Sequence, residues 1–215
     1  MRRRFSIVSY TGTGTSPVSV GHGLGVAPTF LIFKDRDTVV NWQVWTTAIS
    51  SSGTVLEGLN TTAAGTTPWT YISTTSSLIQ FNSGNSSQTT NGKKFICYAF
   101  SPVVGYTSIS SYTGNGSSDG PFVYTGFRPR WVMIKGSSFG GESWFIWDTA
   151  RNTYNQMGAR LLANEALADN SDQVFGDILS NGFKLRNTWG GINGSGNTYI
   201  YVAFAESPFN YSRAR

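Results

Sequence analysis

The feature that most constrains the fold of this 215-residue chain is an internal repeat. A Ser-Tyr-Thr-Gly opening, a Gly-x-x-Pro turn before an apolar run ending in Lys, a tryptophan pair followed by Thr-Ala, and a closing aromatic run each occur twice, in the same order. The matching segments are 9–12 and 111–114, 25–34 and 126–135, 42–48 and 144–150, and 95–100 and 199–204. A repeat of this kind predicts two copies of one unit of about 100 residues. We expect two domains, 1–105 and 106–215.

Composition indicates that each copy consists of strands. The chain has 25 glycines, 14% aromatic residues and only 13% charged residues. Helical domains are rich in Ala, Leu, Glu, Lys and Arg, whereas strands favour β-branched and aromatic residues separated by Gly, Asn and Ser turns. We therefore predict an all-β protein of two tandem, jelly-roll-like β-sandwich domains.

The expected strands are short apolar runs between turn residues. They lie at 5–10, 29–33, 42–47, 77–81 and 95–100 in the first copy, and at 122–124, 130–135, 144–148, 182–185 and 199–204 in the second. The Gly/Ser-rich segments 106–120 and 136–142 are expected to be loops. The segment 159–168 is rich in Ala and Leu and fits either a helix or a loop that holds a strand.

Charge argues against a nucleic-acid partner. The net charge is +5, from 16 Lys and Arg against 11 Asp and Glu, but five of the positive residues lie at the chain ends: Arg2, Arg3, Arg4, Arg213 and Arg215. The body of the chain is therefore neutral, whereas a nucleic-acid groove needs basic residues spread along a surface. We interpret the terminal arginines as either contacts to the acidic surface of another protein subunit or solvated chain ends.

The sequence also predicts no metal, no cofactor and no membrane insertion. With one cysteine, Cys97, and one histidine, His22, the chain has no disulfide framework and no Cys/His zinc cluster. No apolar run approaches the roughly 18 residues of a membrane span, and residues 1–10 lack the apolar core of a secretion signal.

Several motifs of the second copy match a known family pattern. They are Tyr-Thr-Gly-Asn-Gly at 112–116, Gly-Phe-Arg-Pro at 126–129, Trp-Asp-Thr-Ala-Arg at 147–151, Gly-Phe at 182–183 and Val-Ala-Phe-Ala at 202–205. With these residues the chain resembles a domain found repeatedly in tail-fibre and other virion proteins of bacteriophages, especially marine phages. The first copy departs from the pattern at Thr13, Thr46 and Ile49, where the family has Asn, Asp and Arg. The resemblance implies a β-sandwich displayed on a virion, contact with the host surface, and no catalytic residues.

Residues with catalytic chemistry have simpler interpretations. His22 lies in a glycine-rich turn, and Cys97 lies in an apolar strand where a thiol behaves as a buried hydrophobe. Asp148 is expected to form a structural ion pair with Arg151. Paired carboxylates of the second copy leave open a glycoside hydrolase. Besides Asp148 the candidates are Glu142, Glu165, Asp169, Asp172 and Asp177. The segment 169–172 with Asp177 has oxygen ligands that leave open a calcium loop, although it lacks the regular spacing of an EF-hand.

Tryptophans are the candidates for ligand binding, since aromatic faces stack on sugar rings. The members of the pairs Trp42/Trp45 and Trp144/Trp147 are three residues apart, which points the two rings of a pair to opposite faces of a strand. Trp69 and Trp189 lie beside Pro and Gly in expected loops, and Asn193 follows in a glycine-rich turn. We predict Trp69, Trp189 and Asn193 as ligand-binding residues.

These observations predict a non-enzymatic structural component of a bacteriophage virion, most simply a tail-fibre or host-adsorption (receptor-binding) module. It would be made in the host cytoplasm and exposed on the particle as a homo-oligomer, in contact with other virion proteins and with a host cell-surface glycan. A capsid decoration or accessory virion protein is the alternative, favoured by the lack of a recognisable tail-attachment domain or shaft. A glycan depolymerase is a more remote alternative.

Overall fold

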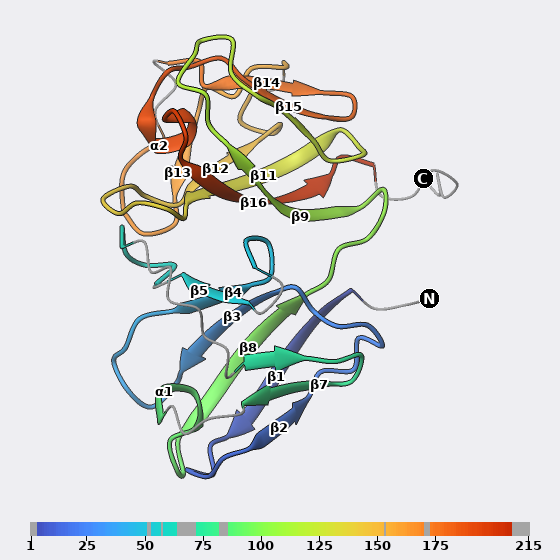
Figure 1. Cartoon of the computed structure of the whole chain (residues 1–215), viewed down its shortest axis with the longest axis vertical. Helices are drawn as coiled ribbons and strands as arrows, with labels where there is room; N and C mark the ends of the chain where they lie inside the picture. The colour runs from blue at the N-terminus through green and yellow to red at the C-terminus, as the bar shows by residue number, and fades with distance from the viewer. Residues whose placement is uncertain are drawn as a thin grey trace. The chain divides into compact units, whose positions relative to one another are not determined.

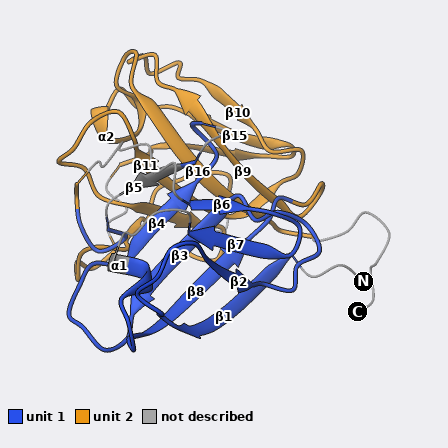
Figure 2. Ribbon diagram, turned by 60° about the horizontal axis from the view of Figure 1, so that its bottom comes forward, with its two compact units in different colours: residues 1–61, 65–102 blue, residues 62–64, 103–215 orange. Residues whose placement is uncertain are grey.

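The chain forms two compact units. The computed structural model describes residues 4–50, 53–56, 58–63, 72–81, 86–152, 154–169 and 173–207 (Figure 1). Unit 1 comprises residues 1–61 and 65–102, and unit 2 comprises residues 62–64 and 103–215 (Figure 2). The main division therefore falls after residue 102, close to the predicted boundary at 105.

Unit 1 contains two antiparallel sheets. The larger has the strand order β1-β8-β3-β4-β5, and the smaller has the order β2-β7-β6. The elements are β1 (Phe5–Thr11), β2 (Val18–Gly21), β3 (Phe30–Asp35), β4 (Gln43–Thr46), β5 (Thr54–Leu56), β6 (Ile72–Thr74), β7 (Leu78–Phe81), the short helix α1 (Ser86–Thr89) and β8 (Lys94–Phe100).

Unit 2 has the same two kinds of sheet, with strand orders β9-β16-β11-β12-β13 and β10-β15-β14. The elements are β9 (Thr107–Thr113), β10 (Phe122–Tyr124), β11 (Pro129–Gly136), β12 (Phe145–Asp148), β13 (Leu161–Leu162), β14 (Gly176–Leu179), β15 (Gly182–Leu185), the short helix α2 (Gly190–Asn193) and β16 (Thr198–Ala205).

The strand orders of the two units match element by element, from β1 with β9 to β8 with β16. The match extends to single hydrogen bonds. The Tyr10 hydroxyl donates to the carbonyl of Gln88 at 3.0 Å, and the Tyr112 hydroxyl donates to the carbonyl of Ile192 at 2.8 Å. Residues of one unit can therefore be paired with residues of the other by strand register.

The core of each unit lies between its two sheets. Burial along β8 alternates, because successive side chains of a strand point to opposite faces. In unit 1 the cluster includes Leu31, Phe33, Trp45, Cys97 and Ala99 from the larger sheet and Ile72, Ile79 and Phe81 from the smaller one. In unit 2 it includes Val132, Ile134, Phe145, Trp147, Tyr199 and Tyr201 together with Val123, Ile178, Phe183 and Leu185. The predicted all-β class is confirmed, and each unit is a sandwich of two sheets.

The tryptophan pairs separate as their spacing predicts. Trp45 and Trp147 belong to the two cores. Trp42 and Trp144 lie outside these clusters, each with a lysine ammonium group 5.9 Å from the ring centroid. The lysines are Lys34 and Lys135, so both units close the same hairpin with a cation–π contact.

One sequence-based expectation for secondary structure is wrong, and the structure decides between the two alternatives for the segment 159–168. The expected loop at 106–120 contains β9, whose Ser/Thr-rich sequence lacks an apolar signal but completes the sheet beside β16. The segment 159–168 forms no helix and instead contains β13, which pairs with β12. Strands β2, β5, β6 and β14 also escaped the prediction, because each is only three or four residues long. No helix within the described residues is long and apolar enough to cross a membrane.

Candidate functional site

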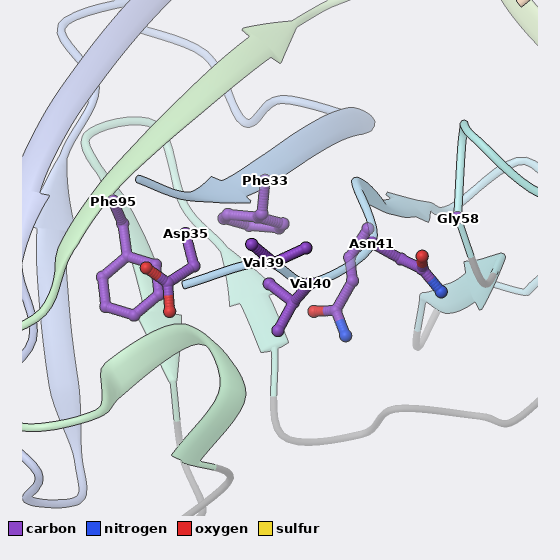
Figure 3. Close-up of a pocket in the computed structure, with 8 residues that line it drawn as sticks. Phe33, Asp35, Val39, Val40, Asn41, Gly58 and Phe95 are labelled. Carbon is purple, nitrogen blue, oxygen red and sulfur yellow. The ribbon is translucent and has the colours of Figure 1, made fainter. Parts of the chain in front are cut away.

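A cavity of about 430 Å³ opens at one end of the unit 1 sandwich. It lies where β3 and β8 meet the loop that leads to β4 (Figure 3). Its lining combines apolar and polar side chains on one small surface. The lining residues are Phe33, Asp35, Val39, Val40, Asn41, Gln43, Gly58 and Phe95.

Strand register places the floor of this cavity. Phe33 and Asp35 are two residues apart in β3, so their side chains share the face that carries the core. Asp35 pairs with Phe95 of β8, and Phe33 pairs with Gln43 of β4. Three neighbouring strands therefore bring two aromatic rings, a carboxylate and an amide together at the end of the sandwich.

Asp35 supplies a fixed negative charge to the cavity. Asp35 is only 8% exposed, and its Oδ1 accepts the backbone N–H groups of Asp37 at 2.8 Å and Thr38 at 3.1 Å. Burial raises the pKa of this carboxyl, but the hydrogen bonds from Asp37 and Thr38, with a smaller contribution from Lys93, outweigh burial and lower the pKa below its usual range. The group is therefore ionised at neutral pH.

The loop beside Asp35 is held by side-chain amides. Asn60 donates from Nδ2 to Oδ1 of Asn41 at 3.0 Å and accepts the backbone N–H of Trp42 at 2.8 Å. Val39 is fully exposed and Val40 is partly exposed at the cavity. Isolated exposed valines need no explanation, but two beside a cavity add apolar surface that a ligand can cover.

The matching position in unit 2 is filled. Gly136 pairs with Tyr199 as Asp35 pairs with Phe95, and a Cβ atom on Gly136 would lie 2.4 Å from Cζ of Phe139. The ring of Phe139 also packs edge-on against Tyr199, with centroids 5.5 Å apart. Phe139 thus occupies the place above Gly136, and it can do so because residue 136 has no side chain.

The loop after Asp35 in unit 1 and the loop after Gly136 in unit 2 share one hydrogen bond at the same place, although the unit 2 loop is one residue longer. Asp37 accepts the backbone N–H of Lys94 through Oδ2, and Ser138 accepts that of Thr198 through Oγ. The next residue is Thr38 in unit 1 and Phe139 in unit 2. Thr38 of unit 1 therefore occupies the position of Phe139, whose ring fills the matching place in unit 2.

Two further core positions of this end are polar in unit 1 and apolar in unit 2. The first is Gln43, which pairs with Phe33 across β3 and β4. In unit 2 the corresponding pair is Phe145 with Ile134, so Gln43 matches Phe145. Gln88 is 1% exposed and matches Ile192, yet neither its amide nitrogen nor its amide oxygen has a hydrogen-bond partner among the described residues. Unpartnered buried amides are rare, and each one requires an explanation.

Two of the predicted ligand residues, Trp189 and Asn193, lie in unit 2 and not in this cavity. Trp69 lies outside the described residues. Trp189 is partly buried and contacts the rings of Phe145 and Phe175, with the Arg160 guanidinium 5.0 Å from its centroid. These contacts place Trp189 against the core of unit 2, and its role in ligand binding stays a prediction.

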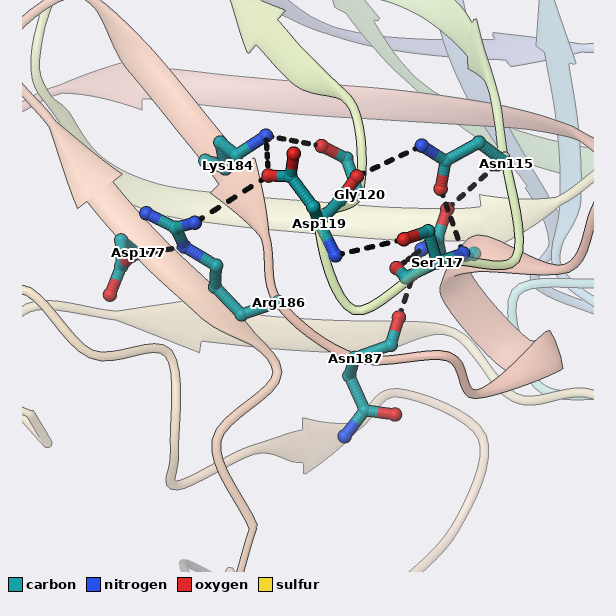
Figure 4. A network of polar contacts seen from close by, with 9 residues as sticks. Asn115, Ser117, Asp119, Gly120, Asp177, Lys184, Arg186 and Asn187 are labelled. Carbon is teal, nitrogen blue, oxygen red and sulfur yellow. Dashed lines mark hydrogen bonds and ion pairs between the residues drawn. The ribbon is translucent and has the colours of Figure 1, made fainter.

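Asn193 bonds to three residues of the polar network of unit 2 that Figure 4 shows, namely Asn115, Ser117 and Asn187. It is fully buried; its Oδ1 accepts the backbone N–H of Asn115 at 2.9 Å, and its Nδ2 donates to the carbonyls of Ser117 and Asn187 at 2.8 and 2.9 Å. These bonds hold the loop after β9 against α2. Asn193 and Trp189 share α2 and its cap, but the amide of Asn193 is already engaged by the protein.

The Asp148–Arg151 ion pair is present. The carboxylate of Asp148 pairs with the Arg151 guanidinium and accepts the backbone N–H groups of Ala150 and Arg151, both at 3.0 Å. In unit 1 Thr46 takes part of this role, since its hydroxyl oxygen accepts the N–H of Ala48 at 3.1 Å. The pair fixes the turn after β12.

Other sequence candidates have structural contacts. His22 is buried, with Nε2 3.1 Å from the carbonyl of Thr75 and Nδ1 accepting the N–H of Leu24. Burial raises the pKa of the Cys97 thiol well above its usual range. Of the terminal arginines, Arg4 accepts a hydrogen bond from Ser101 through its carbonyl. Arg2, Arg3, Arg213 and Arg215 lie outside the described residues.

Three of the remaining carboxylates of unit 2 have side-chain partners, whereas burial raises the pKa of the Glu142 carboxyl above its usual range, against the opposing charges of Lys135 and Arg160. Asp177 pairs with Arg186 at 2.8 Å, and Asp169 lies 3.8 Å from Arg151. Glu165 accepts a hydrogen bond from the Ser143 hydroxyl at 2.7 Å. Asp172 lies outside the described residues. No group of three or more metal-ligating side chains occurs in the described part of the chain.

Sequence reasoning missed the cavity residues. Their signal is the difference between the two copies, Asp35 against Gly136 and Gln43 against Phe145, and it can be recognised only after the repeat is aligned strand by strand. The fold and the site together define a two-unit, all-β protein with an open cavity in unit 1 that is lined by apolar and polar side chains. The chain belongs to the family of the domain of unknown function DUF7483, whose model matches residues 2–208. No curated protein and no solved structure matches the chain.

Proposed function

We propose that this chain is a non-enzymatic component of a bacteriophage virion, a tail-fibre or host-adsorption module whose unit 1 cavity binds a ligand of the host surface. The observation that carries the proposal is the open cavity around Asp35, in a fold whose other copy fills the same place with Phe139. The motif resemblance supplies the virion setting, with other virion proteins as partners.

A buried polar residue near this end of unit 1 supports a binding role. Gln88 does not line the cavity, but burying its amide with no partner among the described residues costs about 1–3 kcal/mol, and Ile192 shows that the fold accepts an apolar residue at this position. Departures from a well-packed core concentrate at functional sites, where another requirement outweighs stability. A binding site at this end of unit 1 is such a requirement.

The engagement of the unit 2 carboxylates supports a non-enzymatic role. Glycoside hydrolysis uses two carboxyl groups that flank a bond, one of them protonated and one free to attack or activate water. Asp148 and Asp177 are instead bound to arginines. Asp35 has a lowered rather than a raised pKa, which does not suit a general acid.

Adsorption competition tests the proposal. The purified chain should inhibit adsorption of the phage that encodes it to host cells. A variant that copies unit 2, Asp35→Gly with Thr38→Phe, should fold and lose the inhibition because its cavity is filled. The control is Asp169→Asn, which removes an exposed charge from unit 2. Equal inhibition by the filled variant would refute the role of the cavity.

Antibody labelling of whole particles tests the location. Label at the tail tip, viewed by electron microscopy, is the expected result for an adsorption module. Label spread over the head would identify a capsid decoration protein instead, and it would overturn the proposed function.

A further inference from the structure

The chemistry of the cavity restricts the ligand it can bind. Its floor and mouth are apolar, from Phe33 and Phe95 to Val39 and Val40, while its polar groups are one carboxylate and two amides. None of the described lining residues is basic. A ligand of this cavity therefore combines an apolar face with hydrogen-bond donors and carries no negative charge.

Asp35 is an acceptor with capacity left for a ligand. A carboxylate offers about four acceptor positions on its two oxygens. The N–H groups of Asp37 and Thr38 use two of them on Oδ1, and the Thr38 hydroxyl also hydrogen-bonds to the group. At least one position stays available to a donor in the cavity, and the Gln43 amide makes no hydrogen bond to the residues that the structure describes.

A neutral sugar fits this combination. A pyranose ring has an apolar face of C–H groups and a rim of hydroxyls, each of which donates and accepts. The cavity, at about 430 Å³, is near the lower end of the range of about 300–1,000 Å³ typical of ligand pockets, which suits a short saccharide. Resting on the proposed function, we infer that the unit 1 cavity binds a neutral saccharide of the host surface and that Asp35 excludes acidic sugars.

The exclusion follows from charge. A uronic acid differs from its parent hexose by one carboxylate in place of a hydroxymethyl group. In this cavity that carboxylate meets the charge of Asp35 with no cation among the described lining residues, so both charges lose hydration without gaining a partner there. Lys93 affects Asp35 electrostatically but does not line the cavity.

Matched sugars provide the test. The purified, isotope-labelled chain is titrated with glucose, galactose and mannose and with the uronic acid of each, while NMR follows the side-chain amide signals of Gln43 and Asn41. We expect at least one hexose to shift these signals, and its uronic acid to bind at least about tenfold more weakly. In Asp35→Asn the hexose should bind about 10- to 100-fold more weakly, the loss of one hydrogen bond to a charged group, and the preference over the uronic acid should disappear.

Different failures are distinguishable. Equal binding of a hexose and its uronic acid to the wild-type chain overturns the inference but leaves the cavity as a receptor site. A lack of binding by all six sugars, while the filled variant still fails to inhibit adsorption, overturns the saccharide assignment alone. Loss of hexose binding in the Asp169→Asn control would show that the effect of Asp35→Asn is not local and would also overturn the assignment to Asp35.

Discussion

Replacing Asn193 with alanine tests whether this residue builds the loop after β9. The buried amide makes three hydrogen bonds to the backbone of Asn115, Ser117 and Asn187. Each contributes a net of about 1 kcal/mol, so the variant should lose about 3 kcal/mol of unfolding free energy. For a unit of this size the melting temperature should fall by roughly 10 °C.

Two measurements together check the prediction. Urea denaturation gives the change in unfolding free energy, and native-state hydrogen exchange reports on the Asn115 amide, whose N–H is bound by Oδ1 of Asn193. In Asn193→Ala this amide should exchange faster. In Asn193→Asp the acceptor is kept, so Asn115 should stay protected more than in the alanine variant although two donor bonds are lost. A loss below about 1 kcal/mol, with Asn115 still protected in the alanine variant, would show that water replaces the side chain and that the reasoning is wrong.

Three further predictions concern the cavity, its filled counterpart and the core. Gly136→Ala should destabilise unit 2 by about 1–3 kcal/mol because the new Cβ meets the ring of Phe139. Adding Phe139→Ala should cancel part of that loss. If thermal denaturation shows that the losses of the two single variants simply add in the double variant, the contact is contradicted. Folding lowers the pKa of Asp35, so the ionised carboxylate contributes to stability above about pH 4, and this contribution is lost as the pH falls through the lowered pKa. Asp35→Asn should remove this part of the acid dependence. Identical acid unfolding curves for the variant and the wild-type chain would refute the prediction. Burial should keep the Cys97 thiol unreactive toward a thiol reagent at neutral pH until the chain unfolds, and rapid labelling of the folded protein would count against that burial.

Much of the strand framework could be predicted from the sequence. Strands with apolar side chains on alternate positions, such as β8 and β16, were located to within one residue at each end, because burial of one or both faces imposes a visible pattern. β9 was missed because its sequence from Thr107 to Thr113 is mostly Ser and Thr, and only pairing with β16 makes it a strand. Tertiary pairing decided that element, and local composition did not.

The candidate site was harder to predict for a different reason. A cavity is space that neighbouring side chains leave empty, and no single residue type in a sequence indicates it. No sequence motif singles out Asp35, whereas Trp189 lies beside glycines in an expected loop and was predicted to bind a ligand. Strand register reverses this ranking, since it places Asp35 at the end of the core face and packs Trp189 against Phe145 and Phe175.

The contact between Gly136 and Phe139 has a consequence for valency. A single side chain added at residue 136 would displace the ring and open a second cavity at the matching place in unit 2. Unit 2 would then have a cavity at the place that Phe139 now occupies. If unit 1 binds its ligand as proposed, this change is one of those by which the chain would gain a second site, and Phe145 and Ile192 would still be apolar where unit 1 has Gln43 and Gln88. Two linked sites bind a surface of repeated ligands with an avidity far above that of either alone.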